Sequence, residues 1–149
     1  MSSEKVASIV NSILGMIQIA IFGFASIAII VGGIGIMNTM YMSVHERIRE
    51  IGIMKAVGAK RKTITTIFLI ESGIFGLFGG FGGMVLGLGL AKVVEFAVRA
   101  TGSLYLKAAI TPQLILFSLA FSFVIGCIAG YLPSRSASKM NPVEALRYE

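Results

Sequence analysis

The sequence predicts an all-α integral membrane protein with three transmembrane helices. A short cytoplasmic helix is expected between the first and second of them, and another at the C-terminus. Of the 149 residues, 56% are hydrophobic and 13% are charged, which is too apolar for a soluble domain of this size. No Lys, Arg, Asp or Glu occurs over residues 6–44 or 72–91, and each run is long enough to cross a bilayer. Between them lies the charged segment 45–62, HERIREIGIMKAVGAKRK.

The distribution of basic residues predicts the orientation. Six of the thirteen Lys and Arg residues lie in the charged segment and three follow the last apolar run, whereas the segment 92–110 holds three and the N-terminal tail one. By the positive-inside rule, the charged segment and the C-terminus are expected in the cytoplasm and the N-terminus outside, with the chain in the cell membrane. The net charge of +6 does not indicate nucleic-acid binding, because base-stacking aromatic motifs and base-reading modules are absent.

The residue types that are missing restrict the chemistry. The chain has one cysteine, Cys127, one histidine, His45, and no aspartate. We therefore expect no catalytic residues, no cofactor and no metal site. The spacing GxxxxGK[ST] of a phosphate-binding loop is also absent. The energy that drives this protein is therefore expected to come from a partner chain, which would carry any ATP hydrolysis, or from an ion gradient.

The first apolar run predicts one long helix that spans the membrane over about residues 19–42. It exceeds the ~20 residues that a crossing needs but is too short for two crossings and a turn. Gly32 and Gly33 lie near its middle. They do not follow a strand and lack the GxGxxG spacing of a dinucleotide site, so we expect them to serve close helix packing.

The charged segment predicts a short amphipathic helix. Ile48, Ile51 and Met54 recur three residues apart with Val57 next in register, which places them on one apolar face. Gly58 follows as the expected C-cap. An ordinary solvated loop that only fixes topology remains the alternative.

The second span is expected over about 64–90. Glu71 lies two turns inside it, and either occupies an interfacial first section or forms a proton or ion site. Gly79, Gly83 and Gly87 repeat every four residues, a spacing typical of a surface for close helix packing.

The outer segment 92–110 leads to a third span over 111–132, which Thr111 and Pro112 open as N-cap and first helical residue. Gly126 and Gly130 form a second small-residue pair for helix packing, and Pro133 is expected to end the helix. In the cytoplasmic tail 133–149, Asn141 as N-cap, Pro142 at N1 and Glu144 at N3 predict a short helix over 142–147.

Three segments, VGGIGIMNTM, ERIREIGIMKAVGAKRK and NPVEALRYE, resemble in sequence and order the C-terminal membrane domain of FtsX-like ABC permeases of the MacB type. The similarity covers essentially all of residues 1–149 as a single domain. It implies a non-catalytic permease subunit that transmits ATP-driven motion from a separate ATPase subunit across the membrane, for efflux or extraction of a substrate. The family also implies a dimer with a second permease copy or a paralogue.

In the family, the matching charged segment is the coupling helix that rests on the ATPase. Carried over by position, the expected ATPase contacts are Glu46, Arg47, Arg49, Glu50, Ile51, Lys55 and Gly58.

One departure concerns the start of the chain. Family members begin with a further transmembrane helix and a large extracytoplasmic domain that have no counterpart here. A fragment or truncated remnant, or half of a split permease whose other half is a separate chain, would account for this. Two other functions stay open: a signalling subunit that activates an extracytoplasmic enzyme without transport, and an ion-coupled carrier that uses Glu71.

Overall fold

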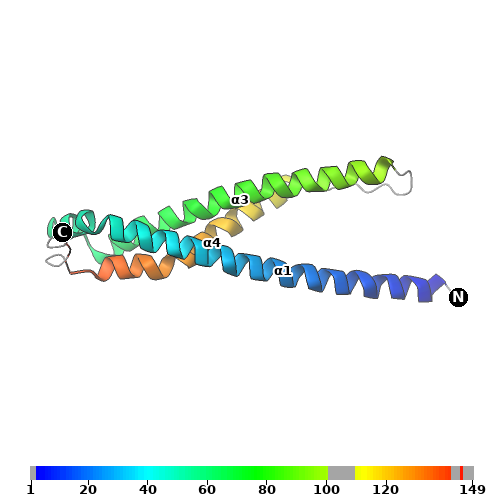
Figure 1. Cartoon of the computed structure of the whole chain (residues 1–149), viewed down its shortest axis with the longest axis horizontal. Coiled ribbons are helices and arrows are strands. Elements are labelled where there is room, and N and C mark those ends of the chain that lie inside the picture. Colours follow the sequence, from blue (N-terminus) through cyan, green and yellow to red (C-terminus); the bar gives the residue numbers. More distant parts are fainter. Residues whose placement is uncertain (1–2, 101–109, 142–144, 146–149) are drawn as a thin grey trace.

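The computed structural model describes residues 3–100, 110–141 and 145, and it contains four helices in that part of the chain (Figure 1). They are α1 (Ser3–Glu46), α2 (Ile48–Ala56), α3 (Arg61–Ala100) and α4 (Pro112–Lys139). The described residues contain no strand. The predicted all-α fold is confirmed, and the short helix lies between the first two long ones as expected.

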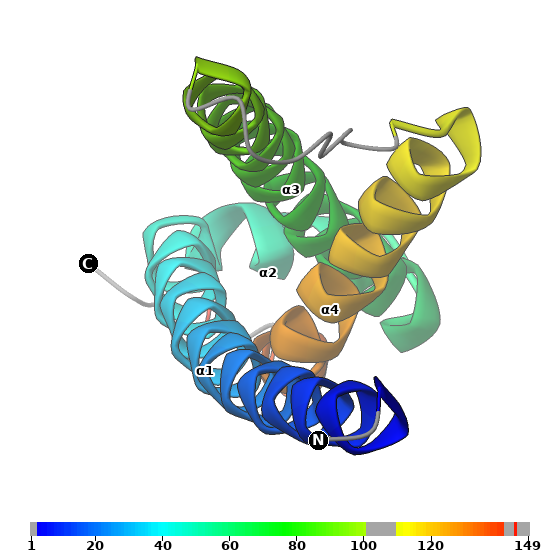
Figure 2. The same ribbon diagram turned by 90° about the vertical axis from the view of Figure 1, so that its right-hand side faces the viewer.

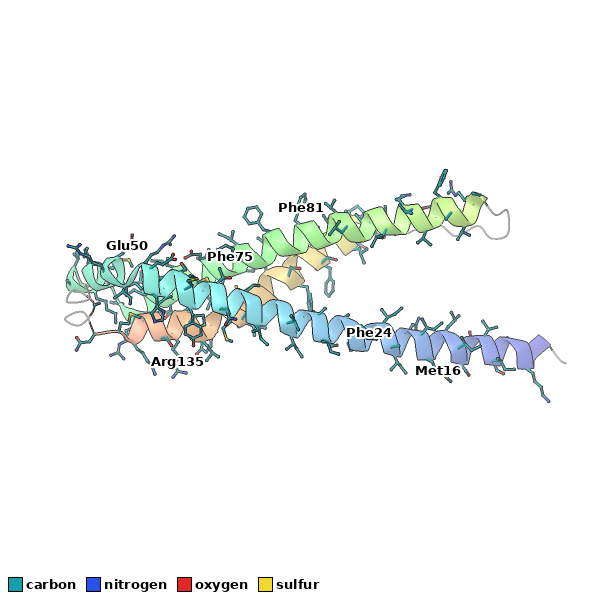
Figure 3. The ribbon with its side chains drawn as sticks, in the orientation of Figure 1. Met16, Phe24, Glu50, Phe75, Phe81 and Arg135 are labelled. Atoms are coloured by element: carbon teal, nitrogen blue, oxygen red, sulfur yellow. The ribbon has the colours of Figure 1, made fainter. Side chains whose placement is uncertain are left out.

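The three long helices, α1, α3 and α4, are long and apolar enough to cross a membrane. Their 44, 40 and 28 residues correspond to about 66, 60 and 42 Å, against a hydrocarbon core of about 30 Å. Large apolar side chains cover their outer surfaces. Phe22, Phe24 and Phe78 are each more than 70% exposed, as expected for side chains that face lipid. Figure 3 shows Phe24 and Met16 pointing away from α1 without a neighbouring helix.

The helices converge at one end of the molecule, which we call the loop end (Figure 1). The end of α1, all of α2, the start of α3 and the end of α4 meet there. Toward the opposite end α1 diverges from the other two, and Figure 2 shows the three long helices splayed around a common axis. α4 packs extensively on α3, less on α1, and α1 touches α3 least.

The main hydrophobic core is confined to the loop end. It consists of buried side chains from all four helices: Met40, Val44, Ile51, Ile64, Phe68 and Ala137. Burial of these side chains fixes α2 against the long helices, since each buried apolar side chain of this size contributes about 1.5–3 kcal/mol.

α3 and α4 make their closest approach through glycine. A Cβ atom built on Gly76 would lie 2.3 Å from the carbonyl oxygen of Ser122 and 3.0 Å from the Cα of Gly126. On each helix the contact follows a four-residue repeat of small residues, Ser72, Gly76 and Gly80 on α3 and Ser122, Gly126 and Gly130 on α4. This spacing lets two helix backbones approach closely in a membrane.

One sequence-based expectation about a helix end is wrong. α4 does not end at Pro133 but continues to Lys139. Pro133 is buried, and the Ser134 hydroxyl donates to the Gly130 carbonyl at 2.5 Å. Contacts with neighbouring helices around a buried proline allow it inside a membrane helix. α3 extends to Ala100, so the first part of the expected outer segment 92–110 is helical.

The predicted C-terminal helix over 142–147 falls almost wholly outside the described residues. Of this stretch the structure describes Ala145, which is buried and whose amide donates to the Asn141 carbonyl at 3.0 Å.

Candidate functional site

The short helix α2 lies across the loop end with one face buried. The chain bends at Arg47, and Ile48, Ile51 and Gly52 are buried behind it. Ile51 is fully buried in the core cluster, with Met54 packed against it. This is the apolar face that the three-residue spacing predicts, with one exception. Val57 is 85% exposed, because α2 ends at Ala56 and the chain turns away after it.

Gly58 ends α2 in a left-handed conformation. Its φ of +99° is one that residues with a Cβ rarely adopt. The Gly58 amide donates to the Lys55 carbonyl at 3.0 Å, and the Ala59 amide donates to the Met54 carbonyl at 2.9 Å. These two bonds form the Schellman arrangement, which satisfies carbonyl groups at the end of a helix. They fix the path from α2 into α3.

The outward face of α2 carries both charged and apolar side chains. Arg49, Ile53 and Val57 are exposed at four-residue intervals, so they share one side of the helix and its end. Glu50 is exposed beside them, and Figure 3 shows it pointing outward at the loop end. Ile53 is 49% exposed. We call Arg49, Glu50, Ile53 and Val57 the α2 surface.

The structure divides the residues predicted to contact an ATPase into two groups. Those whose side chains or backbone are exposed are Glu46, Arg47, Arg49, Glu50 and Gly58. Ile51 is fully buried and presents no side chain to another protein, and Lys55 is half-buried. The sequence analysis did not single out Ile53 and placed Val57 on the buried face, but both are exposed beside Arg49.

One ion pair connects the bend to the second long helix. Arg47 Nη1 lies 3.4 Å from Glu71 Oε1, with side-chain exposures of 51% and 25%. Glu71 therefore has a cationic partner at the bend before α2, and its role in the membrane stays a prediction. A pair this exposed contributes little stability, about 0–1 kcal/mol, but it joins the start of α2 to α3.

Lys55 connects α2 to the end of α4. Its Nζ donates a hydrogen bond to the carbonyl oxygen of Met140. The pKa of Lys55 is lowered, first by partial burial and then by the nearby Arg61 guanidinium. The Lys55 contact and the Arg47–Glu71 pair attach α2 to both α3 and α4.

The predicted packing glycines have different surroundings. Gly126 and Gly130 lie against Ser72 and Gly76 of α3. A Cβ on Gly33 would meet Ala129 at 3.9 Å, whereas Gly32 has no such neighbour within 4 Å. Both line an apolar groove of about 540 Å³ between the three long helices.

Gly79, Gly83 and Gly87 have no such neighbour within 4 Å. A role for them in packing against another chain stays a prediction. The close contact of α3 instead uses Gly73, Gly76 and Gly80, whose Cβ positions would meet atoms of α4.

Comparison with known proteins identifies the family. A family model described as FtsX-like permease C-terminal matches residues 21–142. The chain is 48% identical over 149 residues to the uncharacterized ABC transporter permease MJ1507 of Methanocaldococcus jannaschii, and 43% identical over 149 residues to the uncharacterized ABC transporter permease YknZ of Bacillus subtilis. It is 40% identical over 139 residues to the macrolide export ATP-binding/permease protein MacB of Bdellovibrio bacteriovorus.

These matches cover 100%, 100% and 93% of the chain but 37%, 36% and 20% of the respective relatives. The chain thus corresponds to about a third or less of their length. The matched region holds the three apolar helices and the short helix between the first two. The chain belongs to the FtsX-like permease family.

Proposed function

We propose that this chain is the membrane permease part of an ABC-type complex, in which an ATPase on a separate chain rests on the α2 surface. ATP-driven movement of that ATPase passes through α2 into the long helices and so to the other side of the membrane. The loop end is cytoplasmic in this proposal, and the complex holds a second permease copy. The names of the relatives, which include ABC transporter permeases and an ATP-binding/permease protein, support this assignment.

The proposal depends mainly on the position of α2, which has one face exposed and the other packed against the long helices. A helix that transmits force needs an exposed face for its partner and a rigid connection to the membrane helices. The α2 surface offers two apolar side chains beside an oppositely charged pair. Such a surface suits a specific protein contact, with charge for orientation and apolar area for affinity.

The rigid connection comes from the buried side of the same helix. Ile51 is fully buried among α1, α3 and α4 side chains. The Lys55 hydrogen bond and the Arg47–Glu71 pair add polar contacts to α4 and α3. A load applied to α2 is therefore shared by all three long helices, as expected for close-packed elements that move as a unit.

The test is co-purification of an ATPase with the chain, tagged and extracted from its native membranes in mild detergent. The exchange Arg49→Glu with Glu50→Arg keeps the net charge and leaves every buried contact in place. It should reduce the bound ATPase at least about tenfold, since like charges set opposite each other cost several kcal/mol. Ile53→Asp should act in the same direction.

The matched control is Arg135→Glu. Arg135 is exposed at the loop end on α4, away from Glu50 in Figure 3. The Arg135→Glu variant should still bind the ATPase. It tests whether a charge change anywhere at the loop end is enough to release the ATPase. Undiminished ATPase recovery with the Arg49/Glu50 exchange would contradict the proposal. Mass spectrometry of the recovered proteins also tests for a separate chain with a further helix and an extracytoplasmic domain.

A further inference from the structure

A pocket at the loop end, separate from the groove between the long helices, is lined by positively charged residues. Its volume is about 490 Å³, and the described residues that line it are Lys55, Ala59, Arg61, Lys139, Met140 and Asn141. We call it the basic pocket. Lys55 comes from α2, Arg61 is the first residue of α3, and Lys139 is the last residue of α4. Three cationic side chains from three helices thus meet at one cavity, and none of the lining residues that the structure describes is acidic.

This charge has no counter-charge among the residues that the structure describes. Across residues 3–100, 110–141 and 145, the ion pairs join Arg47 to Glu71 and join Lys92 and Arg99 to Glu95. None of them includes a cation of the basic pocket. The Lys55 ammonium group donates to a neutral carbonyl instead. Convergent like charges at a partly buried site repel one another, and an anion between them would remove that repulsion.

The depth of the pocket along the helices indicates where such an anion comes from. Arg61 precedes Ile64, the first residue of the apolar part of α3, by three residues, or about 5 Å of helix. Lys139 follows Leu132, the last residue of the apolar span of α4, by seven residues, or about 10 Å. The headgroup layer of a bilayer extends about 5–8 Å beyond the hydrocarbon on each side. Arg61 therefore lies at the level of the headgroups, and Lys139 lies a few ångströms beyond them.

We propose that the basic pocket binds the phosphate group of an anionic phospholipid headgroup. Basic pockets between transmembrane helices are suited to anionic headgroups. Arg61 offers the planar guanidinium that pairs with phosphate oxygens in two hydrogen bonds, and the lysines act as point charges. A lipid held there bridges α2, α3 and α4 at the end where the core lies. The interaction does not depend on the proposed ATPase contact, because the pocket shares no residue with the α2 surface.

The test is native mass spectrometry of the purified full chain, exchanged into micelles that contain equal amounts of phosphatidylglycerol and phosphatidylcholine. The wild-type chain should retain phosphatidylglycerol in preference to phosphatidylcholine. The variant Lys55→Gln/Arg61→Gln/Lys139→Gln removes the three pocket charges. The matched control Lys60→Gln/Lys62→Gln/Arg135→Gln removes three exposed charges at the same end that do not line the pocket.

We expect the retained phosphatidylglycerol to fall at least about tenfold in the pocket variant and less than about twofold in the control, because only the pocket offers several charge-assisted contacts to one phosphate. The single variant Lys139→Gln, at an exposed terminal residue of α4, should lower retention about threefold. Because this substitution should not disturb folding, it keeps the proposal testable if the triple variant misfolds. Equal loss in the pocket variant and the control, or no lipid preference in the wild type, would overturn the proposal. Displacement of the lipid by millimolar inorganic phosphate would assign the pocket to free phosphate and would also overturn it.

Discussion

Replacing Gly76 by alanine is expected to force α3 and α4 apart at their closest approach. The new Cβ would lie 2.3 Å from the Ser122 carbonyl oxygen and 3.0 Å from the Cα of Gly126. Both are backbone atoms, which cannot rotate out of the way as a side chain can. Ordinary van der Waals contact begins at 3.4 Å, so the carbonyl oxygen and the Cβ must separate by about 1.1 Å, the difference between 3.4 and 2.3 Å.

The size of the effect follows from that displacement. Overpacking by a single carbon in a close-packed site costs about 1–3 kcal/mol, which corresponds to a factor of about 5–150 in the equilibrium between packed and separated helices. Most close contacts of the crossing lie within one turn of Gly76, so they weaken together. We therefore expect the upper half of this range.

The assay is reversible unfolding in mixed micelles by added sodium dodecyl sulfate, followed by energy transfer between dyes at the exposed positions Lys62 and Arg135 in a Cys127→Ser background. Gly79→Ala is the matched control. It lies on the same helix three residues away, and nothing lies within 4 Å of its Cβ position. Gly76→Ala should shift the midpoint to lower detergent fraction and Gly79→Ala should leave it unchanged. Equal midpoints for the two variants would refute the close contact at Gly76.

Three further predictions concern the loop end. Gly58→Ala places a Cβ at φ +99° and should destabilise the turn after α2 by about 1–2 kcal/mol. Proteolysis at this turn should become faster, with a smaller increase in Gly58→Asn. Equal proteolysis of the wild type and Gly58→Ala would contradict this prediction. A double-mutant cycle on Arg47→Ala and Glu71→Ala should give a coupling energy below about 1 kcal/mol that decreases with salt, and a larger, salt-independent value would place Glu71 in a drier site. The pKa of Lys55 in the folded chain is lowered, first by burial and then by Arg61, from the value of 10.5. Between the lowered pKa and 10.5 the unfolded chain therefore binds more protons than the folded chain. The free energy of unfolding should rise with pH through that window. Lys55→Gln should flatten the slope, measured by detergent unfolding at several pH values, and an unchanged slope would exclude Lys55 as its source.

The membrane spans and the short helix between the first two could be predicted because their signals are local. Charge-free runs on both sides of the charged segment set the first two crossings, and the spacing of Ile48 and Ile51 set the buried face of α2. Gly58 identified the end of α2 because a left-handed turn strongly favours glycine. Each of these inferences depends on residues that follow one another along the chain, without any contact between distant segments.

The expectations that differ from the structure concern features that tertiary contacts decide. Pro133 is an ordinary helix breaker in isolation, but it is buried at the loop end and α4 continues through it to Lys139. Val57 continues the apolar spacing, yet the turn at Gly58 leaves it exposed. Sequence alone also gives several glycine repeats on α3. Only the position of α4 selects the repeat that contains Gly76 over the one that contains Gly79.

The crossing at Gly76 divides α3 into two unequal arms. Fifteen residues separate it from Arg61 and twenty-four separate it from Ala100, or about 22 and 36 Å of helix. If the crossing stays fixed as a fulcrum, α3 acts as a lever with a gain of about 1.6, the ratio of those lengths. A sideways push of about 1 Å on the short arm then emerges at the far tip as about 1.6 Å in the opposite direction. In the proposed complex, the place of Gly76 along α3 would thus set the ratio between the displacements at the two ends of that helix.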